Sequence, residues 1–167
     1  MSWHHYHVHT FDHVLDGIYD ECRKGGDKEV TGMLIGKPCV WNKQYYVLIN
    51  RYIPLEATSS PFHVTVNPES MASAMKEVSS KYPKELVIGW YHSHPGYGVF
   101  LSETDFLTQR LIFKEWFHVA LVVDHIRKEY GFFALTDDGG YTRVTHAVWR
   151  YVGGAVRAGS YGQRRKT

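Results

Sequence analysis

The chain has 167 residues, of which 44% are hydrophobic and 22% charged, and its formal net charge is +2. This length suits one domain with a sizeable core, the composition excludes an intrinsically disordered chain, and the small charge argues against bulk nucleic acid as a partner. No apolar run is long enough to span a bilayer and the first residues lack a signal-peptide pattern. Cys22 and Cys39 have no paired spacing, so we expect a cytoplasmic protein without a thiolate metal site or a membrane partner.

Hydrophobic periodicity and turn residues divide the chain into alternating strands and helices, which together predict one mixed α/β domain. The predicted elements, in chain order, are a strand over residues 5–11, a helix over 11–23, strands over 29–36 and 45–53, a polar loop over 54–61, a strand over 62–66, a helix over 67–82, a strand over 86–92, a helix over 102–113 and strands over 118–124, 130–135 and 141–151.

Several of these boundaries depend on single residues. Histidines alternate in the segment 5–11, which suggests metal binding, but we favour an edge strand or a solvated face. Pro38 is expected to end the strand over 29–36. From Gly153 the sequence is glycine-rich and basic, which predicts a flexible tail, and its last charges are expected to be solvated rather than bound to nucleic acid.

Two of the central elements are defined by their composition. Asn67 followed by proline is typical of a helix start. The segment 86–92 is nearly all apolar, as expected of a strand that is buried on both faces, and packing is the default role for its aromatic residues. Helical spacing places four residues of the 67–82 helix on one apolar face, which we assign to the core: Met71, Ala74, Met75 and Val78.

The segment GWYHSHPGYGVFLSETD combines residue types that bind metals. His92 and His94 are two apart on a predicted strand, so both side chains can converge on one ion. Ser102 then starts a helix, and Asp105, three residues later, faces the same way. Each feature alone has an ordinary structural explanation, a core histidine or a helix cap. Together, two imidazoles and a carboxylate form a common catalytic zinc set.

The spacing of these residues resembles the JAMM (MPN+) metalloprotease motif of the Mov34/PAD-1 family: His92-x-His94, seven residues, Ser102, two residues, Asp105. The family adds a glutamate in a segment of the form Glu-x-x-Gly-x-Leu-x-Gly, and EVTGMLIG from Glu29 is similar to it. The flanks PGYG and Thr-Gln resemble the proteasome-lid and signalosome isopeptidases.

The resemblance extends from about Val8 to Tyr151 and implies a cytidine-deaminase-like α/β fold. We therefore expect a single MPN domain at residues 1–152, with a mixed curved sheet flanked by helices, and a flexible tail at 153–167. The sequence passes from 118–124 to 130–135 without the second insertion of eukaryotic relatives, and no helical extension follows. This resembles a compact, stand-alone prokaryotic member.

The same resemblance implies roles for five residues. His92, His94 and Asp105 would hold one zinc ion per chain, Glu29 would be the general base for the zinc-bound water, and Ser102 would donate to the oxyanion. The substrate would be the bond after the C-terminal Gly-Gly of ubiquitin or a ubiquitin-like protein, cut in deconjugation or precursor maturation. Activating enzymes of the E1 type and conjugating enzymes of the E2 type would be further partners.

The first family insertion corresponds to the loop over 54–61, which is a candidate wall of the substrate slot. Two alternatives remain: release of a sulfur-carrier protein from a small adduct, and a non-catalytic MPN scaffold. His118 and His125 are not assigned to the site. Met75 is core by its helical spacing, but if its side chain faces outward it could contact the modifier. The candidate substrate-binding residues are Pro54, Leu55, Thr58, Ser59 and Met75.

Overall fold

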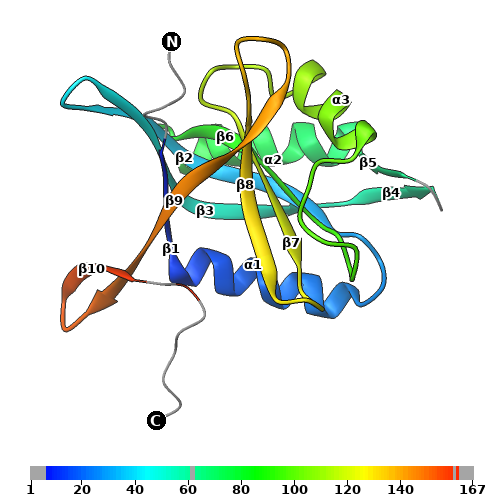
Figure 1. The fold of residues 1–167 in the computed structure, drawn as a ribbon, viewed down its shortest axis with the longest axis horizontal. Coiled ribbons are helices and arrows are strands. Elements are labelled where there is room, and N and C mark those ends of the chain that lie inside the picture. Colours follow the sequence, from blue (N-terminus) through cyan, green and yellow to red (C-terminus); the bar gives the residue numbers. More distant parts are fainter. Residues whose placement is uncertain (1–6, 61–62, 160, 162–167) are drawn as a thin grey trace.

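The computed structural model describes residues 7–60, 63–159 and 161 (Figure 1). The elements follow one another as β1 His7–Phe11, α1 Asp12–Gly25, β2 Thr31–Trp41, β3 Gln44–Leu55, β4 Ala57–Ser60, β5 His63–Val66, α2 Pro68–Lys81, β6 Leu86–Ser93, α3 Glu103–Leu111, β7 Val119–Asp124, β8 Glu129–Leu135, β9 Tyr141–Val152 and β10 Ala155–Gly159. Within these residues no helix has the length and apolar character needed to cross a membrane.

The main sheet curves until it closes on itself. Its strand order is β1-β3-β2-β6-β7-β8-β9-β10, and β1 also pairs with β9. β1 runs parallel to both of its neighbours and β6 runs parallel to β7, whereas the other pairs are antiparallel. The mixed, curved sheet confirms the predicted fold class. The expectation of an edge strand over 5–11 is wrong for β1, because that strand has a partner on each side.

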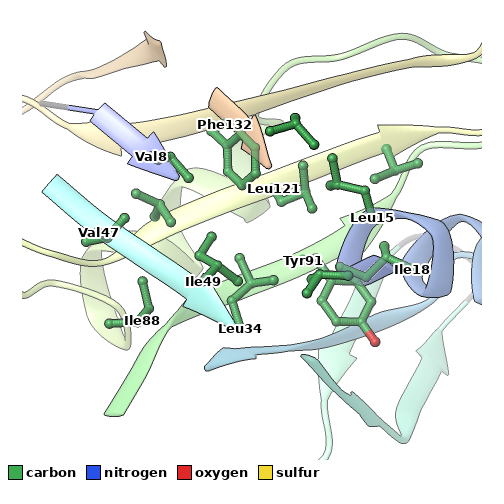
Figure 2. Close-up of a cluster of buried hydrophobic side chains, with 14 of the residues drawn as sticks. Val8, Leu15, Ile18, Leu34, Val47, Ile49, Ile88, Tyr91, Leu121 and Phe132 are labelled. Atoms are coloured by element: carbon green, nitrogen blue, oxygen red, sulfur yellow. The ribbon is translucent and has the colours of Figure 1, made fainter. Parts of the chain in front are cut away.

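The sheet has two buried faces. Inside the curve, side chains from seven strands of the described chain pack against the apolar face of α1. Figure 2 shows this cluster with Leu15 and Ile18 of the helix against Leu34, Tyr91 and Leu121 of the sheet. The other face packs under α2 and α3 through two smaller clusters. Because neighbouring residues of a strand point to opposite faces, Met33 and Leu34 of β2 belong to different clusters.

Gly32 of the early motif has a steric role in this arrangement. A Cβ at Gly32 would lie 2.2 Å from the ring of Tyr91, so a larger residue would push that ring away. The buried Tyr91 hydroxyl donates a 2.6 Å hydrogen bond to Glu21 of α1. The glycine therefore allows β2, β6 and α1 to pack closely behind the site.

The β2–β3 hairpin is longer than the sequence predicts. β2 continues past Pro38, which pairs with Val47, and turns at Asn42 and Lys43, both with positive φ. β6 pairs with β2 only as far as Gly36. Beyond that point β2 has one partner, so the N–H that proline lacks can face the side without a strand.

The segment 54–61, predicted as a loop, is mostly strand. β3 continues to Leu55, and β4 pairs antiparallel with β5, so that Thr58 lies opposite Thr65. This small two-stranded sheet projects from the body near α2 (Figure 1). Short polar strands carry little hydrophobic alternation, which explains why the pattern did not reveal them. Residues 61–62 at its tip lie outside the described part of the chain.

The expected flexible tail from Gly153 is wrong for residues 155–159. Gly153 and Gly154, with φ of 57° and 79°, form a turn, and β10 then pairs antiparallel with the end of β9. Tyr161 further donates a 2.9 Å hydrogen bond to Asp16 of α1. The end of β9 offers backbone groups for pairing, and this tertiary feature outweighs the local glycine content. Residues 160 and 162–167 lie outside the described chain.

Candidate active site with a metal-binding triad

The two histidines of the motif lie where β6 ends. His92 is the second-last residue of β6, and the backbone N–H of His94 donates a 2.8 Å hydrogen bond to Val123 of β7. Both imidazoles are almost completely buried, with exposed fractions of 1% and 2%. Ser93 points away from them and accepts a 2.9 Å hydrogen bond from the N–H of Val30. This bond fixes the start of β2, and hence Glu29, beside the end of β6.

Asp105 reaches the histidines from the first turn of α3. The Ser102 hydroxyl accepts a hydrogen bond from the N–H of Asp105 at 3.1 Å, and the N–H of Ser102 donates to Asp105 Oδ2 at 2.9 Å. These two bonds form a capping box, which fixes the carboxylate relative to the helix start. The Asp105 carboxylate therefore takes part in the helix cap and is also a candidate metal ligand, two roles that the sequence left as alternatives.

Three potential ligand atoms form a compact triangle. His92 Nε2 lies 3.2 Å from His94 Nε2 and 3.0 Å from Asp105 Oδ2, and the third side, from His94 Nε2 to Asp105 Oδ2, is 3.1 Å. In a tetrahedral zinc site with bonds of about 2.0–2.1 Å, ligand atoms are about 3.3 Å apart. The triangle therefore needs little adjustment to hold one ion. Among the described residues it is also the group whose chemistry and closeness suit a metal.

Hydrogen bonding prepares His94 for this role. Its Nδ1 lies 3.1 Å from the carbonyl oxygen of Gly98, which can only accept a hydrogen bond. The proton of the neutral imidazole therefore resides on Nδ1, and Nε2 presents its lone pair to the triangle. A backbone carbonyl behind a ligating histidine is a common feature of metal sites, and its presence here supports the fit to zinc.

His92 is oriented by stacking. Its Nδ1 is buried and has no hydrogen-bond partner among the described residues, but its ring stacks on Trp90 with a centroid distance of 4.4 Å. Trp90 Nε1 donates a 2.7 Å hydrogen bond to the fully buried Gln109 of α3. The amide of Gln109 also donates to the carbonyls of Phe113 and His118, at 2.9 and 3.2 Å.

The sequence predicts only a packing role for Trp90, and Gln109 is noted there only within the flank that resembles the isopeptidases. Tertiary contacts add that Gln109 holds the indole that supports a ligand. His118, in turn, accepts from the N–H of Glu115 and contacts the carbonyl of Val87, so both of its ring nitrogens are engaged away from the triad. His118 therefore offers no free ring nitrogen to the triad.

The charge state of the triad suits metal binding. Burial by itself would raise the pKa of Asp105, but the adjacent imidazoles of His92 and His94, together with the N–H of Ser102, hold that pKa far below its usual range. The carboxylate therefore remains ionised at neutral pH. It can offer Oδ2 as an anionic ligand.

The aromatic side chain of Tyr97 links Glu29 to the triad. Glu29 Oε1 accepts a 2.7 Å hydrogen bond from the hydroxyl of Tyr97, whose ring stacks on His94 at 5.2 Å. Burial and the neighbouring Glu29 carboxylate raise the pKa of Tyr97, so its hydroxyl stays protonated and available as a donor. The structure thus brings His92, His94 and Asp105 together and joins Ser102 to Asp105 through the capping box. It links Glu29 to His94 through Tyr97, which the sequence did not nominate.

The candidate substrate-binding residues differ in their surroundings. Leu55 is buried among core residues under α2, so its side chain is not accessible to a substrate, and this candidate is wrong. Met75, assigned to the core by helical spacing, is 49% exposed on α2. Of the four residues on that predicted apolar face, only Ala74 and Val78 are buried. Pro54 is exposed near the end of β3, and Thr58 and Ser59 lie in β4.

The family described as JAB1/Mov34/MPN/PAD-1 ubiquitin protease matches residues 3–115, which include the triad and Glu29. The NAD(+) hydrolase TcpA of a Theionarchaea archaeon is 34% identical over 120 residues, which cover 71% of this chain and 34% of that protein. COP9 signalosome complex subunit 5 of Drosophila melanogaster is 37% identical over 108 residues, which cover 63% of this chain and 32% of that protein. The chain thus spans about a third of the length of these relatives.

A solved structure supports the fold. The solution structure of a protein from Desulfitobacterium hafniense matches with a TM-score of 0.69 and 19% sequence identity. The match covers 87% of this chain and 95% of that one. At this identity the likeness concerns the arrangement of strands and helices alone.

Proposed function

Because the chain belongs to the JAB1/Mov34/MPN/PAD-1 family, we propose that it is a zinc-dependent isopeptidase. It hydrolyses the bond that follows the C-terminal Gly-Gly of ubiquitin or of a ubiquitin-like modifier. The observation that carries this proposal is the triangle of His92, His94 and Asp105 with sides of 3.0–3.2 Å, beside which Tyr97 holds the carboxylate of Glu29.

The protein's own residues divide the reaction into binding and proton transfer. His92, His94 and Asp105 would hold the metal, which would supply Lewis acidity and make the attacking water more acidic. Glu29 accepts the proton of the attacking water and delivers it to the leaving amine. A lysine ε-amine leaves poorly unless it is protonated, so this second transfer is as important as the first.

Ser102 supports the developing negative charge on the scissile carbonyl oxygen. Its hydroxyl oxygen accepts from the N–H of Asp105, which leaves the hydroxyl proton free to be donated to a substrate. Such a donor is typically worth about 3 kcal/mol of barrier lowering. Because the capping box fixes Ser102 relative to a metal ligand, the donor and the metal keep a constant separation.

A Gly-Gly tail suits the surroundings of this site. An extended chain without side chains can pair with a strand edge at close range, and the β4–β5 sheet offers such an edge near α2. Pro54, Thr58 and Ser59 lie along this hairpin or lead into it, and exposed Met75 on α2 provides an apolar contact for the modifier. The bound partner is therefore a folded modifier with a flexible C-terminal tail, conjugated by enzymes of the E1 and E2 types.

The test is cleavage of a panel of ubiquitin and ubiquitin-like C-terminal fusions and isopeptide conjugates, with NAD⁺ included because one relative is named for its hydrolysis. Metal content is measured on the same preparation. We expect cleavage after Gly-Gly that is lost with a chelator and in Glu29→Gln, and retained in the exposed-acid control Glu129→Gln. If only a sulfur-carrier protein is released from its cysteine adduct, the result would favour that alternative over the isopeptidase. If the purified protein binds no zinc, the result would favour a non-catalytic scaffold.

A further inference from the structure

Asp124 at the end of β7 is a fully buried carboxylate whose hydrogen-bonding capacity is occupied. Its Oδ1 accepts from the backbone N–H groups of Gly96, Ile126 and Arg127, at 2.9, 3.1 and 3.0 Å. Its Oδ2 accepts from the N–H of Gly98 at 2.8 Å and lies 3.7 Å from Arg127 Nε. One side chain therefore joins the β7–β8 turn to the loop that follows β6.

That loop, residues 95–98, has a conformation that needs support. Gly96 and Gly98 have φ of 83° and 92°, values that side chains other than glycine rarely adopt. The loop belongs to no strand or helix, and the N–H groups of both glycines are satisfied by the Asp124 carboxylate. Burial would raise the pKa of Asp124, but the four backbone N–H donors lower it, so the carboxylate remains an acceptor at neutral pH.

The same loop contacts both working parts of the site. The carbonyl oxygen of Gly98 accepts a hydrogen bond from the Nδ1–H of His94, which leaves Nε2 free for the metal. Tyr97, between the two glycines, stacks on His94 and donates to Glu29. A shift of this loop would therefore disturb a metal ligand and the general base together.

We infer that Asp124 is a positioning residue of the active site, which acts through loop 95–98 to orient His94 for metal binding and, through Tyr97, to hold Glu29. It touches neither metal nor substrate. The inference rests on the proposed zinc chemistry, but it assigns a role to a residue outside the motif. A role limited to stability would lower the melting temperature without changing zinc affinity per folded molecule.

The experiment compares zinc dissociation constants of the full-length protein and its variants by competition with a chromophoric chelator, on samples shown to be folded. Asp124→Asn places an amide NH₂ where a carboxylate oxygen accepts backbone N–H groups. We expect zinc affinity to fall by about 10–100-fold, the range typical for partners of ligating residues. The buried core change Leu15→Ala, which destabilises the fold away from the loop, should leave zinc affinity unchanged.

A second pair of variants separates the two branches and covers poor folding of Asp124→Asn. Gly98→Ala keeps the buried carboxylate but strains the loop at φ 92°, and we expect it to weaken zinc binding as well. Tyr97→Phe keeps the stacked ring and removes the hydroxyl, so it should leave zinc affinity intact. It should lower kcat on a Gly-Gly substrate by about tenfold or more, a part of the roughly 10²–10⁴-fold that a general base contributes, because Glu29 stays present but loses its positioning hydrogen bond.

The outcomes distinguish this inference from the proposed function. Zinc affinity within twofold of the wild type in folded Asp124→Asn, or in Gly98→Ala if the first variant does not fold, overturns the positioning role while the function stands. Zinc binding by the wild type, weakened by Asp124→Asn but without any cleavage, supports the positioning role and overturns the isopeptidase. Failure of the wild type to bind zinc overturns both.

Discussion

Replacing Gln109 by methionine should reveal how strongly the protein depends on the support behind His92. Methionine has a similar length but no hydrogen-bonding amide. The change leaves three groups without their present partner in a buried setting: the N–H of Trp90 and the carbonyls of Phe113 and His118. Each buried group left unsatisfied costs about 1–3 kcal/mol, so the variant should lose about 3–6 kcal/mol after partial relaxation.

That loss is large for a domain of this size, because typical domains have a total stability of about 5–15 kcal/mol. At about 2–4 °C per kcal/mol, the melting temperature should fall by about 6–24 °C. Zinc affinity per folded molecule should also fall several-fold, because Trp90 would no longer hold the His92 ring through its 4.4 Å stack.

Urea unfolding and thermal melts, with and without a chelator, measure the stability change, and chelator competition measures zinc affinity. Gln44→Met makes the same chemical change at an exposed position in β3 and should alter stability by less than about 0.5 kcal/mol. A Gln109→Met variant within 1 kcal/mol of the wild type would refute the reasoning. In that case the buried amide would not be what holds the indole.

Three further predictions concern the metal, the modifier and pH. Asp105→Ala should fold but lose bound zinc, since two imidazoles remain; zinc occupancy equal to the wild type by elemental analysis would contradict the ligand assignment. Met75→Glu should raise KM for a modifier fusion about fivefold or more without lowering kcat, and Val156→Glu on β10 should not; equal kinetics for both variants would remove Met75 from the substrate site. Burial lowers the pKa of His118, so the unfolded chain binds its proton more readily, and the free energy of unfolding should decline as pH falls below about 6.5. His118→Gln should reduce that decline in urea melts between pH 7 and pH 5, and an unchanged slope would assign it to other groups.

The candidate metal-binding triad could be predicted from the sequence because each of its parts is local. Residues that are two apart on a strand face the same way, and Ser-x-x-Asp at a helix start directs the carboxylate back toward the cap. Apart from β4 and β10, the chain order of strands and helices followed from the same local patterns, as did the cap at Asn67 and the strand buried on both faces. The family motif added Glu29, which no local pattern separates from an ordinary exposed acid.

Some predictions failed where tertiary pairing outweighed local composition. Pro38 lies inside β2 because the strand has one partner there, and residues 155–159 form β10 because the end of β9 has groups to pair. Met75 is exposed although its helical position is apolar, since the sheet beneath α2 covers only part of that stripe. Propensity describes one segment at a time, whereas pairing depends on a neighbour that is distant in sequence.

The sequence by itself determined which atoms could bind a metal, but only the tertiary structure decided what orients them. Val30 meets Ser93 across 63 positions and Tyr97 meets Glu29 across 68, and both contacts require β2 to lie beside β6. Asp124 reaches the loop after β6 only because β7 runs parallel to that strand and ends level with it. Strand order is fixed by the burial of the whole sheet rather than by the residues of any one strand. The residues that support the triad therefore carry no local signal of their role.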